Sequence, residues 1–435
     1  MKVAVVGLGK IGLPLAVQIA DSGCRVIGVD TNPEVVRLVN NGQEPFPGEV
    51  ELENRLSKVA RSRNLEATCD TTDAARQATE IVVVVPLYVD DKGQPDFASI
   101  DSATTLVGRG LQRGALVTFE TTLPVGTTRQ RFTKNLEQES GLTVGTDFHV
   151  VFSPERVLTG RVFSDLRRYP KLVGGVTPEC GMRGANFYDR ILKFDARTDL
   201  VRPNGVWNLG SCEAAELAKL AETTYRDVNI ALANQFAKFA NSQSIDLSAV
   251  IEACNSQPYS HIHQPGIAVG GHCIPIYPQM YLLNDPAADV VRAARSTNES
   301  MPEYFVQRLE QAHGTLKDEL VLVLGASYRG NVKESAFSGV FSVVRALRAR
   351  EARCWVTDPY YSPEEIAALE LPNDGDSAEV TAIIVQADHH EYQRIDFGQF
   401  PKLRTVLNGR SFSISPPPSG VNPIGMFELR DFRRN

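Results

Sequence analysis

The stretch Val3-Ala4-Val5-Val6-Gly7-Leu8-Gly9-Lys10-Ile11-Gly12-Leu13-Pro14-Leu15-Ala16 decides the fold of this chain. A short β-branched run leads directly into glycines with G-x-G-x-x-G spacing, and an apolar helical segment follows. Glycines in this context allow a tight turn and let a pyrophosphate approach the helix N-terminus, although a purely structural turn is the alternative. Dinucleotide phosphates are therefore predicted to bind at Gly7, Gly9, Lys10, Ile11 and Gly12.

Asp30 ends the next β-branched run, Arg25–Asp30, where an acidic residue can bind the adenosine ribose hydroxyls. A carboxylate at this place repels a 2′-phosphate, so the sequence favours NAD over NADP. Arg37 lies near enough in the sequence to bind such a phosphate, but we interpret it as a solvated helix residue.

Short apolar runs alternate with amphipathic segments at both ends of the chain, which predicts the α/β class with two Rossmann-like, doubly wound domains. Residues 211–241 contain neither Pro nor Gly and predict one long central helix that joins these domains. We expect domains at 1–200, 201–312 and 313–435. The predicted strands are 3–6, 25–30, 81–86, 115–121, 149–153, 320–325, 354–359, 381–387 and 405–408.

The composition excludes several classes of protein. A formal net charge of −7 argues against nucleic-acid binding, and no apolar run approaches the roughly 18 residues of a membrane span. Seven scattered cysteines, without a C-x-x-C pair, indicate neither a disulfide framework nor a metal site. We expect a soluble, unprocessed, cytoplasmic protein that binds no nucleic acid, membrane or metal.

Two segments that follow predicted strands carry polar groups. Thr122 lies in Glu120–Thr128, where a hydroxyl could hold the nicotinamide amide or a water, whereas Thr127 and Thr128 are equally explained as helix caps. In Phe152–Val157, Glu155 could act as a base for water and Arg156 as an anion clamp, with a surface ion pair as the alternative.

Lys219 lies inside the predicted long helix, with Arg226 and Asn229 seven and ten residues further on. This spacing places the three side chains near one helical face. A single helix lysine is usually solvated, so the hypothesis of a functional lysine depends on these companions.

Cys273 ends a glycine-rich segment, Gln264–Cys273, that contains Gly270 and Gly271. The glycines let the backbone wrap around a ligand, and a thiolate there could act as a nucleophile. The alternative is a small buried hydrophobe, because Ile274-Pro275-Ile276 follows directly.

Seven motifs in one order resemble the UDP-glucose and GDP-mannose dehydrogenase family, most closely its UDP-N-acetylmannosamine dehydrogenase branch. The resemblance spans nearly the whole chain. The motifs are GLGKIGLPLA, ETTLPVGTT, FSPERV, KLVGG, AELAKLAETTYRDVNIALANQ, QPGIAVGGHCIP and VLVLGASYRG.

The resemblance implies an NAD-dependent, two-step oxidation of a UDP-sugar at C6, through a cysteine thioester, by a homodimer paired through the long helix. The three predicted domains would then bind NAD, form the dimer with the cysteine loop, and bind the UDP-sugar. Cys273 would be the nucleophile, Lys219 would stabilise the oxyanion, and Thr122 and Glu155 would hold water or nicotinamide. Pro86 would lie beside the cofactor. The implied substrate-binding residues are Arg156, Val157, Lys219, Thr223, Arg226, Gly270 and Arg329.

Several positions depart from the family's pattern. Thr223 and Tyr277 replace an asparagine and an aspartate, Ala336 replaces an arginine, and Arg329 replaces a lysine near the pyrophosphate. Leu87 replaces a threonine on the nicotinamide side, and Gln257 and Tyr259 replace a histidine and an arginine before the cysteine loop. Thr223 and Tyr277 keep hydroxyls, so we expect a rearranged network rather than an inactive site.

The predicted function is NAD-dependent, four-electron oxidation of a UDP-sugar, in particular a UDP-N-acetylhexosamine, to its uronic acid for an acidic polysaccharide or glycosylated product. Three alternatives remain open at this point: a UDP-glucose 6-dehydrogenase, a non-catalytic nucleotide-sugar-binding relative, and a single-step β-hydroxyacid dehydrogenase in which Cys273 is only structural.

Overall fold

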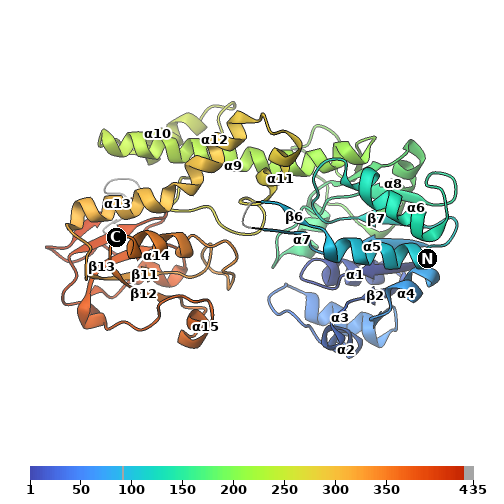
Figure 1. Cartoon of the computed structure of the whole chain (residues 1–435), viewed down its shortest axis with the longest axis horizontal. Helices are drawn as coiled ribbons and strands as arrows, with labels where there is room; N and C mark the ends of the chain where they lie inside the picture. Colours follow the sequence, from blue (N-terminus) through green and yellow to red (C-terminus); the bar gives the residue numbers. More distant parts are fainter. Residues whose placement is uncertain (91–92, 426–435) are drawn as a thin grey trace. The chain divides into compact units, whose positions relative to one another are not determined.

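The computed structural model describes residues 1–90 and 93–425 (Figure 1). The chain divides into two compact units, Met1–Glu222 and Thr223–Asn435. Among the described residues, no helix is long and apolar enough to cross a membrane.

Unit 1 is built around a sheet with the strand order β10-β9-β8-β7-β4-β1-β2-β3. Its strands are β1 Lys2–Val6, β2 Arg25–Val29, β3 Leu65–Thr68, β4 Glu80–Val83, β7 Leu116–Phe119, β8 His149–Phe152, β9 Lys171–Gly175 and β10 Val206–Asn208. A separate hairpin pairs β5 Tyr88–Val89 with β6 Pro95–Asp96. The central strands are buried on both faces because helices cover both sides, as expected of a parallel sheet.

Helices pack on both faces of this sheet and form two hydrophobic clusters with it. They are α1 Gly12–Asp21, α2 Pro33–Asn40, α3 Leu52–Arg61, α4 Thr71–Gln77, α5 Ala98–Gly110, η1 Thr128–Thr133, α6 Lys134–Ser140, α7 Val162–Arg168 and α8 Pro178–Ile191. Local signals begin several of them: the side chain of Asn32, for example, accepts a hydrogen bond from the Glu34 amide, with Pro33 at the first helical position.

The predicted long helix is α9, Cys212–Ser242. Its first part belongs to unit 1 and the remainder to unit 2. In unit 2 it is followed by α10 Leu247–Asn255, α11 Tyr277–Asn284, α12 Asp289–Glu299 and α13 Met301–His313.

The sheet of unit 2 has the order β12-β11-β13-β14-β15, and every pair is parallel. Its strands are β11 Leu320–Leu324, β12 Arg353–Thr357, β13 Val380–Val385, β14 Thr405–Asn408 and β15 Asn422–Ile424. The accompanying helices are α14 Val340–Arg348 and α15 Pro363–Ala368, with short 3-10 turns η2 Ser377–Glu379, η3 His390–Arg394 and η4 Phe397–Gln399. Two hydrophobic clusters again cover the sheet faces.

The predicted fold class, two Rossmann-like domains and a long central helix, is confirmed. The unit 1 sheet differs from the prediction in two ways. It contains β3, β9 and β10, which were not predicted, and β9 pairs antiparallel with β8, so β9 and β10 run against the other strands. The alternation of apolar runs carries no information on strand direction. The reversal brings the first residue of β9, Lys171, to the edge where β7 and β8 end.

Candidate functional site

The turn after β1 has the geometry of a pyrophosphate cradle. Gly7 has φ +97°, and its amide donates to Val29 O at 2.8 Å. A Cβ on Gly12 would lie 1.8 Å from Gly7 O, so a side chain cannot be accommodated there. A Cβ on Gly9 would meet nothing within 4 Å, which leaves the backbone open to a ligand at the N-terminus of α1.

The Asp30 carboxylate borders this turn. Its Oδ2 accepts a hydrogen bond from the Leu8 amide at 3.0 Å, and its Oδ1 accepts one from the Asn32 amide at 2.9 Å. The side chain stays partly exposed, so its remaining acceptor capacity suits ribose hydroxyls. Arg37 forms an exposed ion pair with Glu34, as expected of a solvated helix residue. These residues fit NAD.

Around this cradle, Lys10 is exposed and Ile11 precedes the first turn of α1. Pro86 follows β4 and is exposed, whereas Thr122 follows the neighbouring strand β7 and is 7% exposed. Both therefore lie at the carboxyl-terminal edge of the sheet, where ligands bind in open parallel sheets.

The segment after Thr122 is anchored to the first turns of α9. Glu216 accepts hydrogen bonds from the Gly126 amide at 2.6 Å and the Thr128 amide at 2.8 Å. Burial raises the pKa of Glu216 to about 7, despite these amide hydrogen bonds. Arg129 and Glu213 add an ion pair between the same two segments.

Glu155 follows β8 and belongs to a buried polar cluster, which we call the Lys171 cluster: Glu120, Glu155, Lys171 and Tyr188. Lys171 Nζ donates to Glu120 Oε2 at 2.7 Å and to Glu155 Oε2 at 2.9 Å. The Tyr188 hydroxyl donates to Glu120 Oε1 at 2.5 Å. Of these four residues, only Glu155 was a predicted site residue.

Arg156 and Lys219 meet at a carboxylate that the sequence analysis did not identify. Glu222 accepts from Arg156 Nε at 2.9 Å and from Lys219 Nζ at 3.5 Å. The Arg156 amide also donates to Glu155 Oε1 at 2.9 Å. Three of the predicted residues, Glu155, Arg156 and Lys219, are thus brought together within unit 1, while Val157 packs against the hydrophobic core.

In unit 2, Cys273 lies just before α11, and its carbonyl accepts from the Tyr277 amide at 2.9 Å. The residue is partly exposed, unlike the buried hydrophobe of the alternative interpretation. All seven cysteines are free. No group of three or more potential metal-ligating side chains occurs within residues 1–90 and 93–425.

The glycines before Cys273 pack against the segment that carries Arg329. A Cβ on Gly270 would lie 2.6 Å from Phe337 O, and Gly271, with φ +87°, faces the Tyr328 ring. The Gly271 amide donates to Ala336 O at 3.1 Å. The cysteine loop and this segment are therefore held in contact within one unit.

A partly buried guanidinium strengthens this connection. Arg410 donates from Nη1 to Ala268 O at 3.3 Å and from Nη2 to Tyr328 O at 3.1 Å. Arg329 itself is exposed, and its Nε donates to the Tyr328 hydroxyl at 3.0 Å.

The predicted companions of Lys219 on α9 are differently placed. Arg226 is exposed, and the neighbouring Thr223 is buried. The Asn229 side chain donates from Nδ2 to His261 O at 2.7 Å and accepts at Oδ1 from the His263 amide at 3.0 Å. Asn229 therefore holds the segment before the cysteine loop. Of the divergent positions, Leu87 packs on the core of unit 1, and Gln257 and Tyr259 are exposed.

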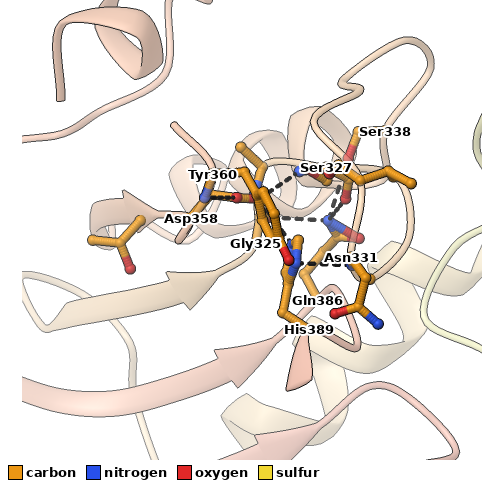
Figure 2. A network of polar contacts seen from close by, with 12 residues as sticks. Gly325, Ser327, Asn331, Ser338, Asp358, Tyr360, Gln386 and His389 are labelled. Atoms are coloured by element: carbon orange, nitrogen blue, oxygen red, sulfur yellow. Dashed lines mark hydrogen bonds and ion pairs between the residues drawn. The ribbon is translucent and has the colours of Figure 1, made fainter. Parts of the chain in front are cut away.

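A polar network closes the turn after β11 (Figure 2). Asp358 Oδ2 accepts from the Ala326 and Ser327 amides, both at 2.9 Å, and from His389 Nε2 at 3.1 Å. His389 Nδ1 accepts from the Asn331 amide at 3.0 Å, so the ring is the neutral Nε2–H tautomer. The network fixes both ends of the segment that presents Arg329.

Three family matches cover most of the chain. Residues 1–192 match the NAD binding domain of the UDP-glucose/GDP-mannose dehydrogenase family, residues 213–300 its central domain, and residues 322–412 its UDP binding domain.

Individual relatives align along nearly their whole length. UDP-N-acetyl-D-mannosamine dehydrogenase of Pyrococcus horikoshii is 33% identical, with 96% of this chain and 97% of that protein covered. NDP-N-acetyl-D-galactosaminuronic acid dehydrogenase of Ralstonia solanacearum is 30% identical, with 94% and 95% covered.

The solved structure of the UDP-D-ManNAc dehydrogenase from Pyrococcus horikoshii superimposes with a TM-score of 0.86 at 31% identity, covering 98% of this chain and 99% of that one. The resemblance drawn from the seven motifs is confirmed. This chain belongs to the UDP-glucose/GDP-mannose dehydrogenase family and is an NAD-dependent nucleotide-sugar dehydrogenase.

Proposed function

We propose that this enzyme oxidises the C6 alcohol of a UDP-N-acetylhexosamine twice, to the uronic acid, through a thioester on Cys273. The observation that carries the proposal is the partly exposed Cys273 at the end of a glycine loop that packs against the Arg329 segment. The proposed nucleophile and the cation proposed to bind the diphosphate thus belong to one unit.

The cofactor roles follow from the geometry of unit 1. Gly7, Gly9, Lys10, Ile11 and Gly12 would hold the pyrophosphate of NAD, and Asp30 its adenosine ribose. Pro86 and Thr122 would border the nicotinamide, which accepts a hydride in each oxidation. Because Glu216 binds the amides after Thr122, the Thr122 segment is fixed before NAD binds.

Two groups of residues are proposed to bind the nucleotide sugar. Arg226 and Arg329 would bind the diphosphate, and Arg156, Val157, Thr223 and Gly270 would line the sugar nucleotide. Two relatives are named for UDP-N-acetyl-D-mannosamine and NDP-N-acetyl-D-galactosaminuronic acid, which supports an N-acetylhexosamine.

The proposed reaction consists of two oxidations followed by one hydrolysis. The first oxidation removes a hydride and a proton from the alcohol and leaves an aldehyde, and Lys219 stabilises negative charge on its oxygen. The Cys273 thiolate adds to the aldehyde, and a second hydride loss gives the thioester. Water, held by Glu155, then attacks the carbonyl, the C–S bond breaks, and the thiolate is regenerated.

We further propose three domains, with the NAD domain over 1–200, a central helical domain over 201–312 and the UDP-sugar domain over 313–435. The enzyme is proposed to be a cytoplasmic homodimer that supplies an acidic sugar for a polysaccharide. An exposed apolar stripe on α9, formed by Tyr225, Leu232, Phe236 and Phe239, supports pairing through this helix.

The test is a turnover screen with NAD and four UDP-sugars: UDP-N-acetylmannosamine, UDP-N-acetylglucosamine, UDP-N-acetylgalactosamine and UDP-glucose. We expect NADH formation with at least one N-acetylhexosamine. Preference for UDP-glucose would move the assignment to the UDP-glucose enzyme, and binding without turnover would make the chain a non-catalytic relative.

A Cys273→Ala variant tests the covalent step. It should lose uronic acid formation while keeping NAD and UDP-sugar binding, measured by calorimetry. Full activity in this variant would exclude the thioester and favour single-step chemistry.

A further inference from the structure

The Lys171 cluster is almost fully buried, and the proposed cofactor contacts do not explain why charged side chains are buried there. The side chains of Glu120 and Lys171 are 0% and 4% exposed, and that of Glu155 is 12% exposed. They come from the ends of β7 and β8 and the start of β9, while Tyr188 comes from α8. Burying charges costs several kcal/mol per ion, so two carboxylates around one ammonium call for an explanation.

The cluster holds one proton more than the unfolded chain would hold at neutral pH. Burial raises the pKa of Glu120 to about 8, although the nearby Lys171 ammonium lowers it. Burial also raises the pKa of Glu155, but Lys171, a hydrogen bond from the Glu120 carboxyl and the Arg156 amide outweigh that effect, so the net pKa lies below its ordinary value. Glu120 is therefore protonated and Glu155 ionised at neutral pH.

The other groups around the cluster also favour a protonated Glu120 and an ionised Glu155. Burial raises the pKa of Tyr188 well above its ordinary value, so its hydroxyl stays neutral and donates to Glu120. Lys171 Nζ also lies 4.8 Å from the centre of the Tyr188 ring. Next to Glu155, the Arg156 side chain is paired with Glu222, which also contacts Lys219. The ammonium of Lys171 is thus the cation that Glu155 shares with Glu120.

We propose that Lys171 is a positioning residue for thioester hydrolysis: together with Glu120 and Tyr188, it keeps Glu155 ionised and aligned to take a proton from the attacking water. This inference rests on the proposed function. In the step, the water oxygen bonds to the thioester carbon, its proton passes to Glu155, and the C–S electron pair stays on Cys273 sulfur. The hydride transfers do not use the cluster.

The first experiment separates hydrolysis from oxidation in a Lys171→Met variant. We expect a burst of two NADH per active site at nearly the wild-type rate, followed by turnover slower by about 10²–10⁴-fold, the usual contribution of a general base. Mass spectrometry should find the sugar acyl group on Cys273. An equal loss of burst and turnover would overturn the proposal.

Two further variants provide the controls. Lys193→Met removes an exposed lysine in the segment after α8 and should change neither phase. Lys171→Arg keeps a cation and should recover part of the hydrolysis rate. If the wild type gives no NADH with any UDP-sugar, the proposed function fails instead, and the two failures remain distinguishable.

A second measurement does not depend on turnover. Infrared spectroscopy of the wild type should detect a protonated carboxyl group at neutral pH that titrates near pH 8 and is missing in Glu120→Gln. The same variant should lose the step near pH 8 in the hydrolysis rate. If the carboxyl signal that titrates near pH 8 persists in Glu120→Gln, or if wild type shows no signal with that titration, Glu120 does not hold the proton and the proposal is wrong.

Discussion

The turns after β1 in unit 1 and after β11 in unit 2 share one backbone pattern. Gly7 N donates to Val29 O at 2.8 Å, and Gly325 N donates to Thr357 O at 2.7 Å. One residue later, the Leu8 amide donates to Asp30 at 3.0 Å, and the Ala326 amide donates to Asp358 at 2.9 Å. Each unit therefore joins its first two strands through an aspartate at the end of the second.

The two aspartates differ in what else they bind. Asp30 is partly exposed and accepts one further hydrogen bond, from the Asn32 amide. Asp358 is 6% exposed and also accepts from the Ser327 amide, the Tyr360 amide and His389 (Figure 2). The same turn thus offers a carboxylate to a ligand in unit 1, and in unit 2 uses it to hold the chain's own segments.

Strand order shows a related difference. The part β3-β2-β1-β4-β7-β8 of unit 1 follows the dinucleotide-binding order 3-2-1-4-5-6, whereas β12-β11-β13-β14-β15 follows the shorter order 2-1-3-4-5. A repeated topology therefore does not imply a repeated ligand, because the side chains around the turn decide its use.

The largest expected effect is a loss of stability when Asp358 is replaced. Replacement by Ala leaves the His389 ring and three amides without their acceptor. Because each buried donor left without a partner costs about 1–3 kcal/mol, we expect the free energy of unfolding to fall by about 3–5 kcal/mol in urea titrations. The matched change Asp30→Ala should cost under about 1 kcal/mol, because the side chain is partly exposed. Equal losses would mean that the two turns are equivalent.

The Asp30→Ala change should instead lower the affinity for NAD. Loss of charge-assisted hydrogen bonds to the ribose, about 1.5–3 kcal/mol, corresponds to affinity on the order of 10–100-fold lower by calorimetry. UDP affinity should stay unchanged. Unaltered NAD affinity would contradict the role given to this carboxylate.

Glycine substitutions sharpen the contrast. Gly9→Ala should fold normally, since its Cβ meets nothing within 4 Å, yet should lower NAD affinity about tenfold by filling the ligand's path. Gly330→Ala places a Cβ 2.0 Å from Asp388 O and should cost about 1–3 kcal/mol of unfolding free energy. The reverse assignment of effects would refute this explanation.

The smallest expected effects concern pH. Burial raises the pKa of Asp358, but hydrogen bonds from His389 and two amides hold it below its ordinary value, so its stabilisation is present above that value and is lost as the pH falls. Glu120, raised to about 8, binds more protons when folded, so its contribution is lost as the pH rises from about 4.5 through 8. Thermal melts of Asp358→Asn and Glu120→Gln should show weaker acid and alkaline dependence, respectively.

The sequence predicted the elements that depend on local pattern. The nine strands, the helix α9 and the glycine turn follow from β-branched runs, helix-forming composition and glycine spacing, and the structure confirms them. Six short strands, β3, β5, β6, β9, β10 and β15, were not predicted. The reversed direction of β9 also leaves no signal in the sequence, because a parallel and an antiparallel strand have the same apolar pattern.

The polar contacts of the candidate site could not be predicted from the sequence either. Lys171 opens an apolar strand, and Glu222 resembles any solvated helix residue, so neither shows its partners in the sequence. The antiparallel register of β9 brings Lys171 to Glu120 and Glu155, and α9 brings Glu222 to Arg156. A charged residue at the start of an otherwise buried strand was the one available signal.

The most direct test of the central claim is the number of NADH molecules formed per molecule of UDP-N-acetylhexosamine consumed to completion. We expect two NADH per sugar, with a uronic acid as the product. One NADH per sugar, with an aldehyde or ketone as the product, would contradict this claim.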